Sequence, residues 1–332
     1  MRGKDRMSEP PKRVLVTGAT GFVGANLARR LVKEGHEVHL LVRPADARWR
    51  IDSMAEDVRL FEAELQDQER VEHAVTRINP QWVFHLAAYG GYASQRNVQK
   101  IVTTNYNGTV NLVEACLKTD FEAFVGAGSS SEYGYQDHAP GERELPEPNS
   151  HYAATKAAAA LYCRFVARAA GRRLATLRLY SVFGPWEDPT RLMPTLLLCG
   201  MHGSLPPLVS PTIARDYVYV DDAVEAFILA AHSPIAEPGP VFNVGTGVQT
   251  SLRQLVELVR KQFRITDEPK WGSMPDRGWD TDVWIADPQA IHAAIGWKPT
   301  MDLEEGFREF TNWIMADAAV MAHYETCRTP PL

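Results

Sequence analysis

The sequence predicts an α/β fold, a doubly wound parallel sheet followed by a smaller, mixed C-terminal domain. Strand-like and helix-like segments alternate from residue 14 to residue 179, as in a parallel sheet covered by helices. Three glycines, Gly18, Gly21 and Gly24, stand between the first strand and the first helix. After Gly184-Pro185 the alternation gives way to an irregular pattern rich in proline and glycine.

Length, composition and charge narrow the class of protein. At 332 residues, of which 45% are hydrophobic, the chain can form one large or two modest domains with a full core. A formal net charge of −6 argues against a nucleic-acid partner. The four cysteines have no short spacing, which indicates buried thiols in a cytoplasmic protein and no disulfide framework or metal site. No apolar run reaches the roughly 18 residues that span a bilayer, so no membrane association is expected.

The glycines at the first strand–helix junction predict a binding loop for a dinucleotide. The strand 14–16 runs directly into Gly18, Gly21 and Gly24, and a helix-like stretch at 25–33 follows at once. One glycine permits the tight turn, one lets the backbone approach a pyrophosphate, and one lets the helix pack on the strand. The helix N-terminus then offers N–H groups and a partial positive charge. This context predicts a Rossmann-like sheet that binds its ligands at the carboxyl ends of the strands.

The other elements follow from the same alternation along the chain. Strands are predicted at residues 14–16, 37–42, 58–61, 82–86, 123–127 and 174–179. Helices are predicted between them at residues 25–33, 69–77, 105–119 and 153–170. In the irregular second half, helices are predicted at residues 221–231, 252–262 and 303–315.

These elements divide the chain into three parts. Residues 1–12 are polar and charged and contain proline, which predicts a flexible tail. Residues 13–184 are expected to form the dinucleotide-binding domain. Residues 185–332 are expected to form mainly a substrate-binding region, with segments near 214–245 returning to the first domain.

Two features suggest chemistry at the strand ends. Tyr152 and Lys156 open the fourth predicted helix at a spacing that places them on one face, about one turn apart. The lysine charge would favour tyrosinate and so lower the tyrosine pKa, which suits proton transfer to or from an alcohol or ketone. Ser129 follows the fifth strand, where a hydroxyl can stabilise a developing alkoxide. Taken alone, a Tyr–Lys pair on a helix is more often structural, and a Ser-rich segment is equally well a plain loop.

The ordered motifs resemble those of the extended short-chain dehydrogenase/reductases. The chain is most similar to their NAD(P)-dependent nucleotide-sugar epimerase/dehydratase/ketoreductase branch, from about residue 13 to residue 315. The resemblance rests on the set and on its order more than on any one motif. The motifs are the segments 17–24, 84–88, 105–109, 152–156, 178–185, 215–222, 243–247 and 296–299.

The resemblance implies a role for each matching position. It implies a catalytic set that consists of Ser129, Tyr152, Lys156 and Asn105. It implies cofactor contacts from Gly18, Thr20, Gly21, Phe22, Val23, Gly24, Arg43, Glu64, Leu65, Leu86, Ala87, Ala88, Tyr152, Lys156 and Tyr180. It implies contacts with a nucleoside-diphosphate sugar from Tyr89, Ser130, Ser131, Ser181, Arg215 and Arg277. It also implies a homodimer formed through two helices of the first half, for which the helices at 105–119 and 153–170 are candidates.

Three positions depart from the family pattern. Arg43 ends the second strand where NAD-preferring members place an acidic residue, so NADP(H) is favoured and NAD(H) remains open; Arg48 and Arg50 could assist. Glu132 is displaced by one position from the acidic pair that dehydratases carry, which argues against 4,6-dehydration. Ser181 replaces a common asparagine, which weakens any transfer of substrate identity.

These observations favour an NADP(H)-dependent oxidoreductase that reduces a 4-keto (6-deoxy) hexose of a nucleoside-diphosphate sugar. The alternative is an NAD-dependent nucleotide-sugar 4-epimerase, because both reactions use the same Tyr152 chemistry. Two further alternatives are a non-catalytic nucleotide sensor, which would not need Tyr152 and Lys156, and a reductase of a non-nucleotide carbonyl. The sequence leaves the nucleotide base, the sugar and the stereochemistry of the product open.

Overall fold

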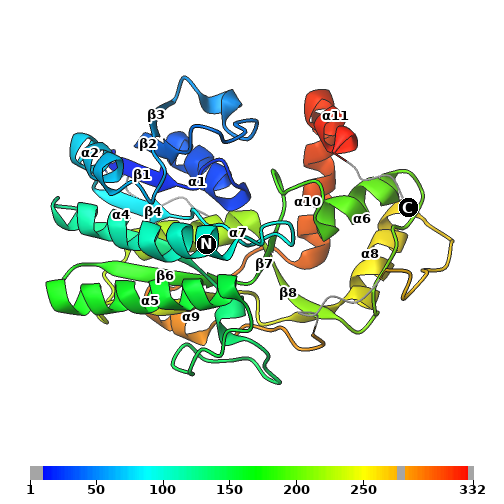
Figure 1. The fold of residues 1–332 in the computed structure, drawn as a ribbon. Helices are drawn as coiled ribbons and strands as arrows, with labels where there is room; N and C mark the ends of the chain where they lie inside the picture. Colours follow the sequence, from blue (N-terminus) through cyan, green and yellow to red (C-terminus); the bar gives the residue numbers. More distant parts are fainter. Residues whose placement is uncertain (1–9, 275–280, 328–332) are drawn as a thin grey trace.

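A seven-stranded parallel sheet organises the first half of the molecule. The computed structural model describes residues 10–274 and 281–327 (Figure 1). The strand order in this sheet is β3-β2-β1-β4-β5-β6-β9. The bounds are β1 (Arg13–Thr17), β2 (Glu37–Val42), β3 (Val58–Glu62), β4 (Trp82–His85), β5 (Ala123–Ser129), β6 (Leu174–Leu179) and β9 (Val241–Val244). The predicted doubly wound sheet is confirmed, and β9 extends it beyond the six strands that the sequence indicated.

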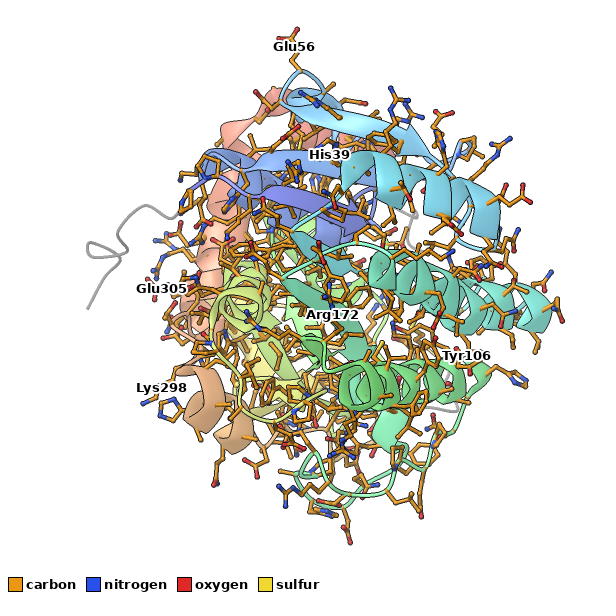
Figure 2. The ribbon with its side chains drawn as sticks, turned by 90° about the vertical axis from the view of Figure 1, so that its left-hand side faces the viewer. His39, Glu56, Tyr106, Arg172, Lys298 and Glu305 are labelled. Atoms are coloured by element: carbon orange, nitrogen blue, oxygen red, sulfur yellow. The ribbon has the colours of Figure 1, made fainter. Side chains whose placement is uncertain are left out.

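Helices cover both faces of this sheet because its strands are apolar on both sides. Along β1, Val14 and Val16 pack on the face that carries α1 (Phe22–Lys33), whereas Leu15 packs on the other face. The first face also holds α7 (Val220–His232) and α9 (Gln289–Ile295). The second face holds α2 (Gln68–Ile78), α4 (Gly108–Leu117) and α5 (His151–Ala170), which are seen side by side in Figure 2.

A smaller, mixed sheet lies in the second part of the molecule, where the sequence predicted a smaller, mixed domain but did not indicate these strands. Its order is β10-β8-β7, with β8 parallel to β7 and antiparallel to β10. The strands are β7 (Ser181–Phe183), β8 (Ala214–Tyr219) and β10 (Gln249–Ser251). The helices α6 (Leu192–Met201), α8 (Leu252–Phe263), α10 (Leu303–Ala316) and α11 (Ala318–Thr326) gather around it (Figure 1). Phe183, Leu196, Leu255, Phe307 and Tyr324 belong to its buried core.

The chain passes from the large sheet to the small one and back again. After β8 it enters α7, which packs on α1, and β9 then pairs with β6 in the large sheet. The segment 296–302 is tied to α7 through Asp222, whose carboxylate accepts from the amides of Thr300 and Met301, both at 3.0 Å. Segments from the second half of the sequence therefore complete the sheet that the first half begins.

Several boundaries differ from the predicted ones. The helix predicted at 105–119 begins earlier, with α3 (Val98–Val102), passes through a π-helical turn η2 (Thr103–Asn107) and continues as α4. The helix predicted at 25–33 begins at Phe22, because Gly21 already serves as its N-cap. The sequence did not indicate α6, α9, α11, β7 or β10, which are short or lie in segments rich in proline and glycine.

The register of the strands brings the site to one edge. Thr17 of β1 pairs with His85 of β4, and His85 pairs with Gly126 of β5. The loops that follow these strands therefore leave the sheet at the same edge, where a doubly wound fold binds its ligands. Residues 1–9 of the predicted tail lie outside the described residues.

Candidate active site

The loop between β1 and α1 has a shape that requires glycine. Gly18 has a φ of +74°, and a Cβ placed there would lie 2.5 Å from the amide nitrogen of Ala87. A Cβ on Gly24 would lie 2.3 Å from the carbonyl oxygen of Gly18, a carbonyl that also accepts from the amide of Gly21 at 3.0 Å. Gly21 has no side chain to cap the N–H groups of α1, which begins with Phe22 and Val23. This uncapped helix end above a side-chain-free loop fits the pyrophosphate of a dinucleotide.

A buried histidine fastens the end of β4 beside this loop. The segment 86–88 continues β4, and the amide of Ala87 donates to Oγ1 of Thr17 at 3.3 Å. His85 bonds to Thr17 at 2.7 Å and to Thr109 of α4 at 2.9 Å. Burial lowers the pKa of His85 to about 3, so the ring is neutral and acts as a hydrogen-bonding link. The sequence analysis noted His85 only as part of a motif, and the link between these three elements emerges from the structure.

Ser129 and Tyr152 meet where β5 ends and α5 begins. Although they are far apart in the sequence, Ser129 is near enough to Tyr152 for its hydroxyl to lower the pKa of the phenol. Lys156 lies one helical turn further along α5 and is 5% exposed. Ser131 adds a second hydroxyl, with its Oγ 2.7 Å from Oγ of Ser129. The structure therefore gathers the predicted hydroxyl, phenol and ammonium groups at the sheet edge beside the glycine loop.

The expected lowering of the Tyr152 pKa does not occur in this structure. Burial raises the pKa of Tyr152 to about 12, and Glu132 adds to this rise through its negative charge. The hydroxyl of Ser129 and the charge of Arg191 act in the opposite direction and lower the pKa of Tyr152. Burial also lowers the pKa of Lys156. Helical spacing placed Tyr152 and Lys156 on one face correctly, but it carried no information about how deeply that face is buried.

Asn105 holds the loop after β4 against α5. It lies in the π-helical turn, where its Oδ1 accepts from the amide of Tyr89 at 2.8 Å. Its Nδ2 donates to the carbonyl of Tyr89 at 2.8 Å and to Oγ1 of Thr155 at 3.0 Å. The amide thus positions Tyr89 next to the helix that carries Tyr152. The sequence analysis missed Thr155, because a threonine between Tyr152 and Lys156 carries no signal of its own.

Glu132 and Arg178 form a buried ion pair under the Ser129 loop. Glu132 is fully buried and Arg178 is 4% exposed, and they meet at 2.8 Å. The other carboxylate oxygen of Glu132 accepts from the amide of Ser129 at 2.8 Å, which completes a capping box over η3 (Ser130–Tyr133). Both carboxylate oxygens of Glu132 are therefore engaged inside the protein, one by the Ser129 amide and the other by Arg178. The spacing Ser-x-x-Glu was the sequence signal that could have identified this box.

Of the substrate residues predicted from the resemblance, Ser130 lines a small hollow, whereas Tyr89, Ser131, Ser181 and Arg215 are not among its lining residues. Its lining includes Ser130, Tyr180 and Trp284, and the indole of Trp284 donates to Oγ of Ser130 at 3.1 Å. Arg215 of β8 stacks on Trp284 at 5.2 Å from the ring centroid. Within residues 10–274 and 281–327, the buried hydroxyl of Tyr180 has no hydrogen-bond partner, and burial raises its pKa. Trp284 carried no signal in the sequence, because it lies in an irregular segment.

The remaining predicted site residues are spread along the same edge. Thr20 and Arg43 both contact Asp46. Leu65 is buried after β3, next to Glu64, and its carbonyl accepts from Asn111 of α4 at 2.9 Å. Ser181 begins β7. The predicted substrate residue Arg277 lies outside the described residues.

The fold and the cradle define a Rossmann-type, dinucleotide-binding α/β protein. The chain belongs to the NAD dependent epimerase/dehydratase family, whose sequence model matches residues 14–245. The resemblance inferred from the motifs is thereby confirmed, and the chain is an enzyme of this family. In the part of the chain that the structure describes, no group of three His, Cys, Asp or Glu residues could hold a metal ion. No helix in that part is long and apolar enough to cross a membrane.

Relatives of known function match almost the whole chain. A UDP-glucose 4-epimerase of Mycolicibacterium smegmatis is 33% identical, covering 89% of this chain and 96% of that protein. A probable UDP-glucuronate 4-epimerase of Rhizobium meliloti is 28% identical, covering 91% of this chain and 96% of that protein. The crystal structure of the UDP-glucose 4-epimerase of Thermotoga maritima with UDP-glucose matches with a TM-score of 0.83 at 29% identity, covering 91% of this chain and 98% of that chain.

Removing the buried carboxylate should be far more damaging than removing an exposed one. In Glu132→Ala, Arg178 is left as an uncompensated buried charge, so the free energy of unfolding should fall by about 3 kcal/mol. The matched control is Glu72→Ala, which breaks an exposed ion pair with Lys118 and should change stability by less than about 1 kcal/mol. Urea denaturation followed by circular dichroism measures both variants. Equal losses in the two variants would contradict the role given to the buried pair.

Proposed function

We propose that the protein is an NAD-dependent 4-epimerase of UDP-hexoses. The observation that carries the proposal is that Ser129, Tyr152 and Lys156 gather where β5 ends and α5 begins, in a chain of which about nine-tenths aligns with 4-epimerases. The comparisons support this alternative better than the NADP(H)-dependent 4-ketoreductase that Arg43 favoured. The family to which the chain belongs is described as NAD dependent.

The cofactor would lie along the carboxyl edge of the large sheet. Gly18, Gly21, Gly24 and the first turn of α1 would hold its pyrophosphate. The segments 64–65 and 86–88, with Tyr180, would line the rest of its path. A bound nicotinamide supplies a reversible acceptor for a hydride from the sugar. We assign residues 13–184, together with α7 and β9, to this cofactor-binding part, and the remaining described residues mainly to the substrate.

Proton transfer is assigned to Tyr152. In its ionised form, the Tyr152 phenolate takes the proton of the sugar hydroxyl as that carbon is oxidised, and the phenol returns the proton after the sugar has rotated in the site. The hydroxyl of Ser129 favours this ionised form and so lowers the pKa of Tyr152. Lys156 supplies a buried positive charge one turn away, and Asn105 fixes the loop that carries Tyr89. These residues do the same work in either direction, as an epimerase requires.

The substrate would occupy the space between the two sheets. Ser130, Ser131 and Ser181 offer hydroxyls near the sugar, and Tyr89 lies across from them on the loop after β4. Arg215 offers a guanidinium on β8 that suits a diphosphate. Arg277 is assigned the same task from the resemblance alone.

Purified enzyme should interconvert UDP-glucose and UDP-galactose, or UDP-glucuronate and UDP-galacturonate, without added reductant. Tyr152→Phe should lower kcat by at least about 100-fold, because it removes the proton carrier, while NAD binding is retained. Product formation by anion-exchange chromatography and NAD binding by calorimetry test the two statements. Turnover of a 4-keto sugar that requires stoichiometric NADPH, with no epimerisation, would favour the ketoreductase and sink this proposal.

The pH profile should report the ionisation of Tyr152. Because burial places the pKa of Tyr152 at about 12, the phenol is protonated at neutral pH. The kcat/KM for the UDP-sugar should therefore rise with pH, by up to about tenfold per unit below the operating pKa. Ser129→Ala removes the hydroxyl that lowers this pKa, so the rising limb should move to higher pH by about one unit. If the rising limb of the kcat/KM profile lies at the same pH in both enzymes, Ser129 does not affect the pKa of Tyr152.

We infer a homodimer through the outer face of α4 and α5. Leu161 and Phe165, one helical turn apart on α5, are 59% and 64% exposed. Tyr162 contacts Tyr106 at 6.3 Å between ring centroids, and Tyr106 lies at the surface beside these helices (Figure 2). Two large exposed apolar side chains one turn apart on the same helix suit a self-complementary contact.

Introducing charge on this face should produce monomers. Phe165→Glu should halve the mass measured by light scattering after size exclusion, because a charge would be buried without a partner. Leu145→Glu, at a loop residue that is 77% exposed, is the matched control and should leave the mass unchanged. A parent protein that is already monomeric at micromolar concentration would refute the dimer.

A further inference from the structure

A chain of three polar side chains joins the glycine loop to the end of β2. Oδ2 of Asp46 accepts from Oγ1 of Thr20 at 2.9 Å. Oδ1 of Asp46 pairs with Nη2 of Arg43 at 2.6 Å. Thr20 lies between Gly18 and Gly21, and Arg43 directly follows β2. The carboxylate of Asp46, 15% exposed, therefore stands between the phosphate cradle and the strand end.

This is the place where a dinucleotide presents its adenosine ribose. In doubly wound sheets an acidic group near the end of the second strand binds the ribose 2′-hydroxyl of NAD, and an arginine there accommodates the 2′-phosphate of NADP. Arg43 occupies the strand end, so the sequence pattern alone favours NADP(H). In the structure, Asp46, three residues further along the chain, places a carboxylate beside the Arg43 guanidinium.

The neighbouring arginines are also engaged. Arg48 forms an ion pair with Glu62 at the end of β3. Arg50 is buried and donates to the carbonyl oxygens of Trp186 at 2.7 Å and Thr20 at 3.2 Å. A 2′-phosphate would therefore meet the charge of Asp46 before it could reach Arg43, and both Arg43 and Arg48 already have carboxylate partners.

We propose that Asp46 selects NAD over NADP, by accepting a hydrogen bond from the ribose 2′-hydroxyl and by neutralising Arg43. This inference rests on the proposed NAD-dependent function, and it assigns cofactor choice to the Thr20–Asp46–Arg43 chain. The carboxylate favours NAD directly, because a charged acceptor binds a hydroxyl strongly. It disfavours NADP twice, because it repels the 2′-phosphate and occupies the guanidinium that would hold it.

The test measures binding of each cofactor in the absence of any sugar nucleotide. Isothermal titration calorimetry gives Kd for NAD and for NADP with the parent enzyme, Asp46→Asn and the double variant Asp46→Asn/Arg43→Gln. Asp46→Asn should weaken NAD binding about tenfold and tighten NADP binding about tenfold, because Arg43 is released. The double variant should lose the gain for NADP. Glu72→Gln, which breaks the exposed ion pair with Lys118 and involves neither Arg43 nor Arg48, is the control and should leave the NAD/NADP ratio unchanged.

The outcomes separate this inference from the proposed activity. An Asp46→Asn enzyme that melts like the parent and keeps the parent's NAD/NADP ratio overturns the role of Asp46. A parent that prefers NADP overturns it as well. If the parent prefers NAD and Asp46→Asn reverses that preference, but no UDP-sugar is epimerised, the selector role stands and the proposed epimerase activity falls.

Discussion

The site depends on one close approach of two backbone segments, where the turn after β1 meets the end of β4. Gly18 can lie against Ala87 only because it has no side chain, since a Cβ would come within 2.5 Å of the Ala87 amide nitrogen. Thr17 and His85 bond across the same junction and hold the two strand ends level. Because β5 continues the register from β4, Ser129 reaches the same edge as the glycine loop. The glycine loop and the Ser129 hydroxyl therefore come to the same edge through the same strand alignment.

A buried ion pair sets the local geometry at the other end of this edge. Glu132 uses one oxygen to hold the Ser129 amide and the other to hold Arg178 of β6. Such a pair contributes little net stability compared with an apolar replacement, because both charges lose their hydration. Here the pair fixes the position of the Ser129 backbone, so that the Ser129 hydroxyl lies near Tyr152. The same carboxylate also disfavours ionisation of Tyr152 through its negative charge. The group that positions Ser129 therefore also raises the pKa of Tyr152.

The sequence predicted the elements that depend on local residue patterns. It failed where contacts between distant residues determine the conformation or the charge. The six strands of the sheet and its glycine loop were recognisable because apolar runs and glycine spacing are local signals. Asn105 was placed in a regular helix, but the chain forms a π-helical turn there, whose amide contacts are made with the distant loop at Tyr89. The cofactor preference inferred from Arg43 changed for the same reason. Its residue type indicated a free cation, whereas the fold of the following loop brings Asp46 back to neutralise it.

Groups from both parts of the molecule change the pKa of Tyr152. Burial alone would keep its phenol protonated, and within the structure the opposing influences are Ser129 from the large sheet and Arg191 from the turn before α6. Arg191 also reaches back across the cleft, donating to the carbonyl of Gly91 at 2.9 Å and stacking on Tyr92. The loop that contains Gly91 lies next to the ring of Tyr152. Any movement that separates α6 from this loop would remove a positive charge from the surroundings of the phenol and raise its pKa further. The pKa of Tyr152 therefore depends on the contact that Arg191 makes with the loop after β4.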